Sequence, residues 1–138
     1  MNPKRYYTVG EANQAIPQIE PLVRSLSQRA GALNGMRSRK AGVSPRPACD
    51  TRVDPDYFRE LEVLNRELRD LSQRGCEIKD LRSGIVDFPA LLNGREVCLC
   101  WRLGENAISH WHEVDAGFKG RQPIAAAHEF EGSSPGEN

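Results

Sequence analysis

The segment VDFPALLNGREVCLCWRL, residues 86–103, has the pattern of a β-hairpin, and the rest of the interpretation builds on it. Apolar residues alternate with others on both sides of Asn93-Gly94, as expected for half-buried strands. Asn and Gly adopt the positive φ angles that a two-residue hairpin turn requires. The turn therefore predicts two antiparallel strands in one register. This register pairs Val86 with Trp101, Phe88 with Leu99, Ala90 with Val97 and Leu92 with Arg95.

The predicted hairpin has two chemically different faces, because successive side chains of a strand point to opposite sides. The apolar face is expected to cover the core and carries Phe88, Val97, Leu99 and Trp101. The opposite face carries Asp87, Glu96, Cys98, Cys100 and Arg102.

A third strand is predicted over 107–114, after a short turn. If this turn has three residues, it places Cys100 opposite His110 and Cys98 opposite His112. A turn one residue longer would flip the third strand. The polar face would then present Ser109, Trp111 and Glu113 instead.

With the shorter turn, the polar face gathers residue types that bind a zinc or iron ion. Thiolates, imidazoles and carboxylates from neighbouring strands can converge on one ion. The candidate metal ligands are Cys98, Cys100, His110, His112 and Asp87. The alternative is that the cysteines are small, inert, half-buried residues and that the histidines lie at the rim of the sheet.

The same residues also allow a thiol-dependent hydrolase or transferase. Cys100 would be the nucleophile and His112 or His110 the base, with Asp87 or Glu113 orienting the imidazole. Reactive cysteines usually lie at a helix N-terminus or a sharp turn that stabilises the thiolate. A position in the middle of a strand lacks that support.

A third interpretation is a binding surface at one end of the sheet, with Arg102, Trp111 and Arg121 as ligand-binding candidates. Trp is common at binding hot spots, and Arg can hold a carboxylate or phosphate in a fork. Alternatively, Trp111 packs in the core, and Arg121 holds its own loop through Asp115 or Glu113.

Two helices are predicted before the sheet. Thr8 and Glu11 form a capping box at the start of the first helix, and Pro17 is expected to bend or restart it. Asp54-Pro55 is typical of the start of the second helix. Both carry apolar seams of alternating four- and three-residue spacing, which predicts an antiparallel helical hairpin. Because two helices leave each seam half covered, the sheet or a second copy of the chain must cover the rest, and we expect a homodimer through the helices.

The composition excludes several classes of protein. The chain has 138 residues, with 19 basic and 19 acidic side chains, a balance that argues against a nucleic-acid binder. The local basic patch, Arg37, Arg39, Lys40, Arg46 and Arg52, is interpreted as a solvated helix end and loop. No apolar run reaches the roughly 18 residues of a membrane span, and the first residues do not resemble a signal peptide. We therefore expect a cytoplasmic protein with reduced cysteines and no membrane partner.

The expected organisation is one α+β domain over residues 1–124. A long antiparallel helical hairpin packs on a small antiparallel β-meander of three to four strands. Residues 41–53 are interpreted as a flexible loop between the helices, and 125–138 as a disordered C-terminal tail, because both are rich in Gly, Pro, Ser or other polar residues.

Several motifs resemble the bacterial domain-of-unknown-function family 2203. They are YTVGEAN at 7–13, KDL at 79–81, GIVDFP at 84–89, CWRLGE at 100–105, WHE at 111–113, GF at 117–118 and GRQP at 120–123. The resemblance implies a small soluble bacterial protein and attaches no activity to it. Its polar motif positions are Asp87, Cys100, Arg102, His112, Glu113 and Arg121, whereas Cys98 and His110 fall outside the pattern. A three-ligand metal site of Cys100, His112 and Asp87 or Glu113 therefore remains.

Three functions are compatible with the sequence. The one that needs least beyond the pattern is a binding or assembly module that uses the sheet end around Cys100, His112 and Arg121. The alternatives are a metal-binding protein or metal-dependent enzyme, and a Cys-His thiol enzyme. The sequence does not decide whether the protein is an enzyme.

Overall fold

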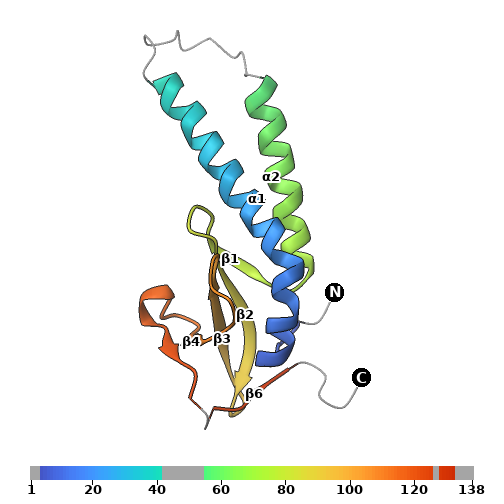
Figure 1. Cartoon of the computed structure of the whole chain (residues 1–138), viewed down its shortest axis with the longest axis vertical. Helices are drawn as coiled ribbons and strands as arrows, with labels where there is room; N and C mark the ends of the chain where they lie inside the picture. Colours follow the sequence, from blue (N-terminus) through green and yellow to red (C-terminus); the bar gives the residue numbers. More distant parts are fainter. Residues whose placement is uncertain (1–3, 42–54, 126–127, 133–138) are drawn as a thin grey trace.

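The computed structural model describes residues 4–41, 55–125 and 128–132, with side chains outside 37–41. It contains two helices followed by an antiparallel sheet, so the predicted α+β class is confirmed (Figure 1). The helices are α1 (Val9–Ala41) and α2 (Pro55–Gln73). The remaining elements are β1 (Glu77–Asp80), β2 (Ile85–Leu92), β3 (Arg95–Arg102), β4 (His110–Glu113), the 3-10 helix η1 (Phe118–Gly120), β5 (Gln122–Pro123) and β6 (Phe130–Glu131). Within these residues, no helix has the length and apolarity needed to cross a membrane.

The sheet has six strands in the part of the chain described, and the predicted count of three to four is wrong. The strands follow the order β1-β2-β3-β4-β5, and β6 pairs with the end of β2. β5 and β6 have two residues each, too few to show the alternation by which a strand is recognised in sequence.

The predicted hairpin register is confirmed. β2 and β3 pair Phe88 with Leu99 and Val86 with Trp101, as expected. The turn residues Asn93 and Gly94 have φ angles of 55° and 78°. Both are positive, as the two-residue turn requires, so this local signal fixes which side chains of the two strands share a face.

The first helix begins with the predicted capping box. The Thr8 amide donates to Glu11 Oε1 at 2.9 Å, and the Glu11 amide donates to Thr8 Oγ1 at 3.1 Å. The helix does not restart at Pro17, one of the two outcomes predicted there, because α1 continues through Pro17 and Pro21. Each proline removes one backbone donor. The buried side of the helix compensates for this loss by packing on the sheet through Ile16, Ile19, Val23 and Leu26.

The two helices pack side by side and run antiparallel (Figure 1). The direction follows from the cross-contacts: Ser25 donates to Glu67, and Arg29, one turn further along α1, also reaches Glu60, nearer the start of α2. The Arg29 Nη1–Glu60 Oε2 distance is 2.7 Å. The loop predicted between the helices lies outside the described residues from 42 onward, and Ala41 is the last residue of α1. The side chains of the basic patch also lie outside them.

The main core lies between α1 and one face of the sheet. Phe88, Leu99 and Trp101 are fully buried there with the apolar side of α1. The Trp101 indole Nε1 donates to the backbone oxygen of Glu105 at 2.9 Å, so its polar atom is satisfied. The predicted core face is therefore confirmed at these positions.

The expectation of disorder from Ala125 onward is wrong for residues 128–132. Phe130 is 8% exposed and pairs in β6 with Leu92 of β2. Its ring also contacts Trp111 edge to face, with 6.1 Å between the centroids. The polar composition predicted a tail, but one aromatic residue supplies enough apolar contact to anchor this segment. Residues 126–127 and 133–138 lie outside the described residues.

Candidate metal centre

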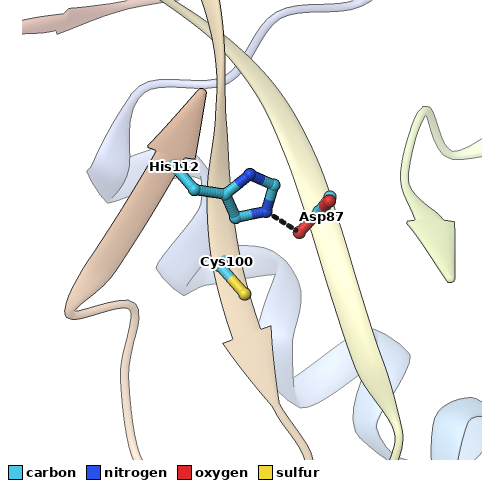
Figure 2. Close-up of side chains that lie close together, drawn as sticks. All are labelled: Asp87, Cys100 and His112. Carbon is cyan, nitrogen blue, oxygen red and sulfur yellow. Dashed lines mark hydrogen bonds and ion pairs between the residues drawn. The ribbon is translucent and has the colours of Figure 1, made fainter. Parts of the chain in front are cut away.

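The register of β4 decides whether the polar residues of the sheet share a face. β3 and β4 pair Cys98 with His112 and Cys100 with His110, which is the predicted register. The predicted three-residue turn and strand over 107–114 are wrong, because residues 103–109 connect the strands and β4 is limited to His110–Glu113. On the other side of β3, Asp87 of β2 pairs directly with Cys100. Asp87, Cys100 and His112 therefore come from three consecutive strands and lie together on the face away from the core (Figure 2).

These three side chains bring their donor atoms close together. A carboxylate oxygen of Asp87, Sγ of Cys100 and a ring nitrogen of His112 all lie within 4.8 Å of one another. The residues are 2%, 0% and 1% exposed. Within the described residues, this is the one group of three or more His, Cys, Asp or Glu side chains with such geometry.

Hydrogen bonds fix the orientation of the His112 ring. Nδ1 lies 2.7 Å from the backbone oxygen of Glu113, and Nε2 lies 3.0 Å from Asp87 Oδ1. A carbonyl oxygen only accepts, so Nδ1 carries a proton and donates it. Nε2 therefore points into the cluster (Figure 2). A contact between Nε2 and Asp87 then needs one further proton on either group, or a cation between them.

Asp87 carries a second, unsatisfied oxygen. Oδ2 is buried and has no hydrogen-bond partner among the described residues. A buried polar atom without a partner costs free energy, about 1–3 kcal/mol, and such atoms are rare in folded proteins. The cluster therefore has acceptor capacity that the chain itself does not use.

The Cys100 thiol is in an environment that keeps it protonated. Burial and, to a smaller extent, the nearby Asp87 charge raise the pKa of Cys100 to about 12, while Arg121 acts in the opposite direction. A nucleophilic cysteine needs a lowered pKa. This environment argues against the thiol-enzyme interpretation, whereas a coordinated metal ion would deprotonate the thiol outright.

The structure places the other predicted ligands outside the three-residue group. Cys98 is 8% exposed, and its pKa is raised to about 12, first by burial and then by Asp87. His110 is half-buried, and its Nδ1 contacts Ser109 Oγ at 2.9 Å. The Glu113 carboxylate binds Arg95 through two contacts of 3.1 and 2.7 Å, so it does not orient His112. Only its backbone oxygen does.

Arg121 is held within the fold by a partner that the sequence analysis missed. Its guanidinium forms two contacts with Glu105, at 3.3 and 2.7 Å, rather than with Asp115 or Glu113. It also lies 4.2 Å from the centroid of the Phe118 ring and 4.0 Å from Cys100 Sγ. Glu105 and Arg121 flank the segment that contains β4 and η1. Their opposite charges were the one available signal, and Arg121 closes the Cys100 side of the cluster.

The two other binding candidates differ in exposure. Trp111 is 4% exposed and packs with Phe130, so the core interpretation applies to it. Arg102 is exposed, with its guanidinium 6.0 Å from the centroid of the Phe118 ring.

A pocket of about 570 Å³ adjoins the cluster on the Asp87 side. Its wall includes Asp87 and Cys98 together with residues of α2 and β1 and the N-terminal segment. Sequence patterns did not indicate this pocket, because its walls come from five separate parts of the chain: residues 4–5, 68–79, 87–89, 96–98 and 114.

Fold and cluster together define a class: a small α+β protein with a buried Asp–Cys–His group on the outer face of a meander. The chain belongs to the family described as "Uncharacterized conserved protein (DUF2203)", which matches it over residues 5–124, as the sequence motifs indicated. No curated protein and no solved structure matches the chain.

Proposed function

We propose that this protein binds one divalent transition-metal ion, in the first place Zn²⁺, through Asp87, Cys100 and His112. The observation that carries the proposal is the convergence of three donor atoms within 4.8 Å in a group that is at most 2% exposed. Carboxylate oxygen, thiolate sulfur and imidazole nitrogen are all zinc ligands.

The spacing of the His112 and Asp87 donors is close to that of two ligands on a tetrahedral ion. Zinc bonds of about 2.0–2.3 Å at tetrahedral angles put neighbouring ligand atoms about 3.3–3.6 Å apart. The contact between His112 Nε2 and Asp87 Oδ1 is 3.0 Å, so the two groups need to separate by only a few tenths of an ångström. Three protein ligands leave a fourth position, as in many catalytic zinc sites.

The surroundings of His112 have the pattern that supports a metal ligand. Ligating histidines commonly donate their second ring nitrogen to a backbone carbonyl, which fixes the ring and its tautomer. The Glu113 backbone oxygen stands in that place. A cation at Nε2 would also replace the extra proton that the Asp87–His112 contact needs, and it could engage the unpaired Asp87 Oδ2.

The interaction-module and homodimer interpretations remain predictions. Two of the residues suggested for a binding surface are engaged inside the fold: Trp111 is buried, and Arg121 is paired with Glu105. Iron is the second candidate ion. The thiolate and imidazole donors suit both metals, and metal analysis distinguishes them.

The proposal is tested by metal content and by cobalt substitution. Protein purified without chelators is expected to contain about one zinc ion per chain by elemental analysis. After removal of that ion, Co²⁺ should bind with one-to-one stoichiometry and give the sulfur-to-cobalt absorption of a coordinated thiolate.

Matched variants assign the signal to the cluster. Cys100→Ser should remove the sulfur-to-cobalt absorption, and His112→Gln should weaken binding by about 10- to 100-fold or more. Cys76→Ser and His110→Gln are the controls, because Cys76 is also buried and His110 lies on the same strand. Circular dichroism verifies that each variant is folded. Folded wild-type protein that takes up neither zinc, iron nor cobalt would contradict the proposal, as would unchanged cobalt absorption in Cys100→Ser.

A further inference from the structure

We propose that the fourth coordination position of this ion opens into the pocket beside Asp87 and that the pocket takes a small organic anion, a carboxylate or phosphate ester with an apolar body. This inference rests on the proposed metal site and assigns that site its ligand class.

The direction of access follows from what covers each side of the cluster. On the Cys100 side, Arg121 lies 4.0 Å from Sγ and is held there by Glu105 and Phe118. Cys100 is fully buried. On the opposite side, Asp87 belongs both to the cluster and to the wall of the 570 Å³ pocket. A metal site needs an entry path, and Asp87 is the one donor residue of the cluster that also lines this pocket.

Three cationic residues line the pocket together with Asp87. Lys4 and Arg5 come from the N-terminal segment, and Lys79 comes from β1. Two further carboxylates, Glu77 and Glu96, line it as well and pair with Lys79 and Lys4. With zinc, thiolate and the Asp87 carboxylate together close to neutral, the three cations exceed the two remaining carboxylates by one positive charge, which favours the approach of an anion.

Two of these cations can engage a ligand at small cost. Arg5 has no carboxylate partner among the described residues and lies 4.4 Å over the Tyr7 ring. Lys79 pairs with Glu77, but both side chains are about half exposed or more, at 45% and 68%. Exposed pairs of this kind contribute little free energy, so Lys79 can exchange its partner for a bound anion.

Part of the remaining wall is apolar and can contact the non-anionic part of the ligand. Leu68 and Leu71 come from α2, Ile78 comes from β1, and Pro89 lies on β2. The pocket volume is in the range of small-molecule sites, about 300–1,000 Å³. An anion that reaches the ion can therefore place an apolar body against these side chains.

The test uses full-length protein loaded with Co²⁺, whose visible absorption responds to a new ligand on the metal. The probes are benzoate and phenyl phosphate, which share a ring but differ in the anionic group, and imidazole at pH 8, which is a neutral ligand. We expect at least one of the two anions to change the cobalt spectrum in a saturable way. The anion that binds more tightly identifies the source as a carboxylate or a phosphate.

A pair of substitutions that removes two positive charges tests the pocket. Arg5→Gln combined with Lys79→Gln is expected to weaken binding of the anion about tenfold and to leave imidazole binding within about twofold. The matched control is Arg59→Gln combined with Lys119→Gln. It removes the same number of charges at exposed positions away from the pocket and should leave both unchanged.

The outcomes separate this inference from the metal site itself. If Co²⁺ binds but neither anion alters its spectrum, or if both double variants weaken the anion equally, the ligand class is wrong and the metal site stands. If Co²⁺ does not bind, the initial titration shows that the metal site and the ligand class fail together.

Discussion

Both faces of the β2–β4 meander contain fully buried side chains, and those side chains are chemically opposite. On one face, Phe88 and Leu99 are fully buried against α1. On the other face, the side chains of Asp87, Cys100 and His112 are at most 2% exposed. The same strands produce both faces through the alternation of side chains. Burial alone therefore does not distinguish the structural core from a candidate metal site. The two are distinguished by whether the buried atoms are apolar or are potential metal ligands.

The faces also differ in what their burial does to stability. Each apolar side chain removed from water stabilises the fold by about 25 cal/mol per Å². Burying Asp87 and His112 costs desolvation free energy that their contact and the Glu113 carbonyl only partly offset, because Asp87 Oδ2 stays unpaired. An ion would change that balance, and the following predictions test this difference.

The largest effect is expected on the apolar face. Phe88→Ala should reduce the free energy of unfolding by about 3–5 kcal/mol, because it leaves a cavity against α1. Urea unfolding followed by circular dichroism measures the change. At metal concentrations at which the variant is folded, it should still bind one ion per chain. A loss below about 1 kcal/mol would show that this face is not the main core.

Metal should stabilise the protein through the polar face. At a free zinc concentration 100 times Kd, the free energy of unfolding should rise by about 2.7 kcal/mol. Asp87→Asn should abolish most of that gain. Its metal-free stability should stay within about 1 kcal/mol of wild type, since the amide can donate to His112 Nε2 without an extra proton. Equal stabilisation of both proteins by zinc would exclude Asp87 as a ligand.

Metal affinity should increase with pH. The pKa of Cys100, raised to about 12 by burial, means that the thiol is protonated at neutral pH and must release its proton when the ion binds. The affinity should rise about tenfold per pH unit between pH 6 and 8, because one proton leaves the thiol for each ion bound. Competition with a chelator of known pH dependence measures it. A flat profile would contradict coordination by Cys100.

The smallest effect concerns Arg121, which we predict to be a positioning residue. Its guanidinium lowers the pKa of Cys100 against the larger effect of burial. Arg121→Gln should therefore weaken zinc binding about fivefold, and Arg121→Lys should restore part of it. The control, Glu105→Gln, keeps the cation. Identical losses in Arg121→Gln and Arg121→Lys would indicate a packing role instead.

The meander was predictable because its signals are local. Asn93-Gly94 fixes the hairpin register, and the connection over residues 103–109 keeps His112 on the predicted face. From these two connections, the sequence places Asp87, Cys100 and His112 on one face without long-range information. The same alternation of side chains also places Cys98 and His110 on this face. Only the side-chain geometry shows that they do not belong to the group of Asp87, Cys100 and His112.

The errors share a dependence on contacts between distant segments. The helix α1 continues through Pro17, where local rules predict a bend or a restart, because it packs on the sheet. Phe130 forms β6 only because the end of β2 and the Trp111 ring receive it. Arg121 pairs with Glu105 rather than with Glu113 or Asp115, which lie closer to it in the sequence. None of these contacts leaves a periodic pattern in the sequence.

The three donor residues lie between positions 87 and 112. Their strands are joined by a two-residue turn, 93–94, and a seven-residue connection, 103–109. Closing such short loops costs little chain entropy, whereas docking the helices requires contacts across much of the chain. The ligand set can therefore come together early in folding, as soon as the meander forms. An ion bound at that stage would hold the three strands in register before the helices dock on the sheet.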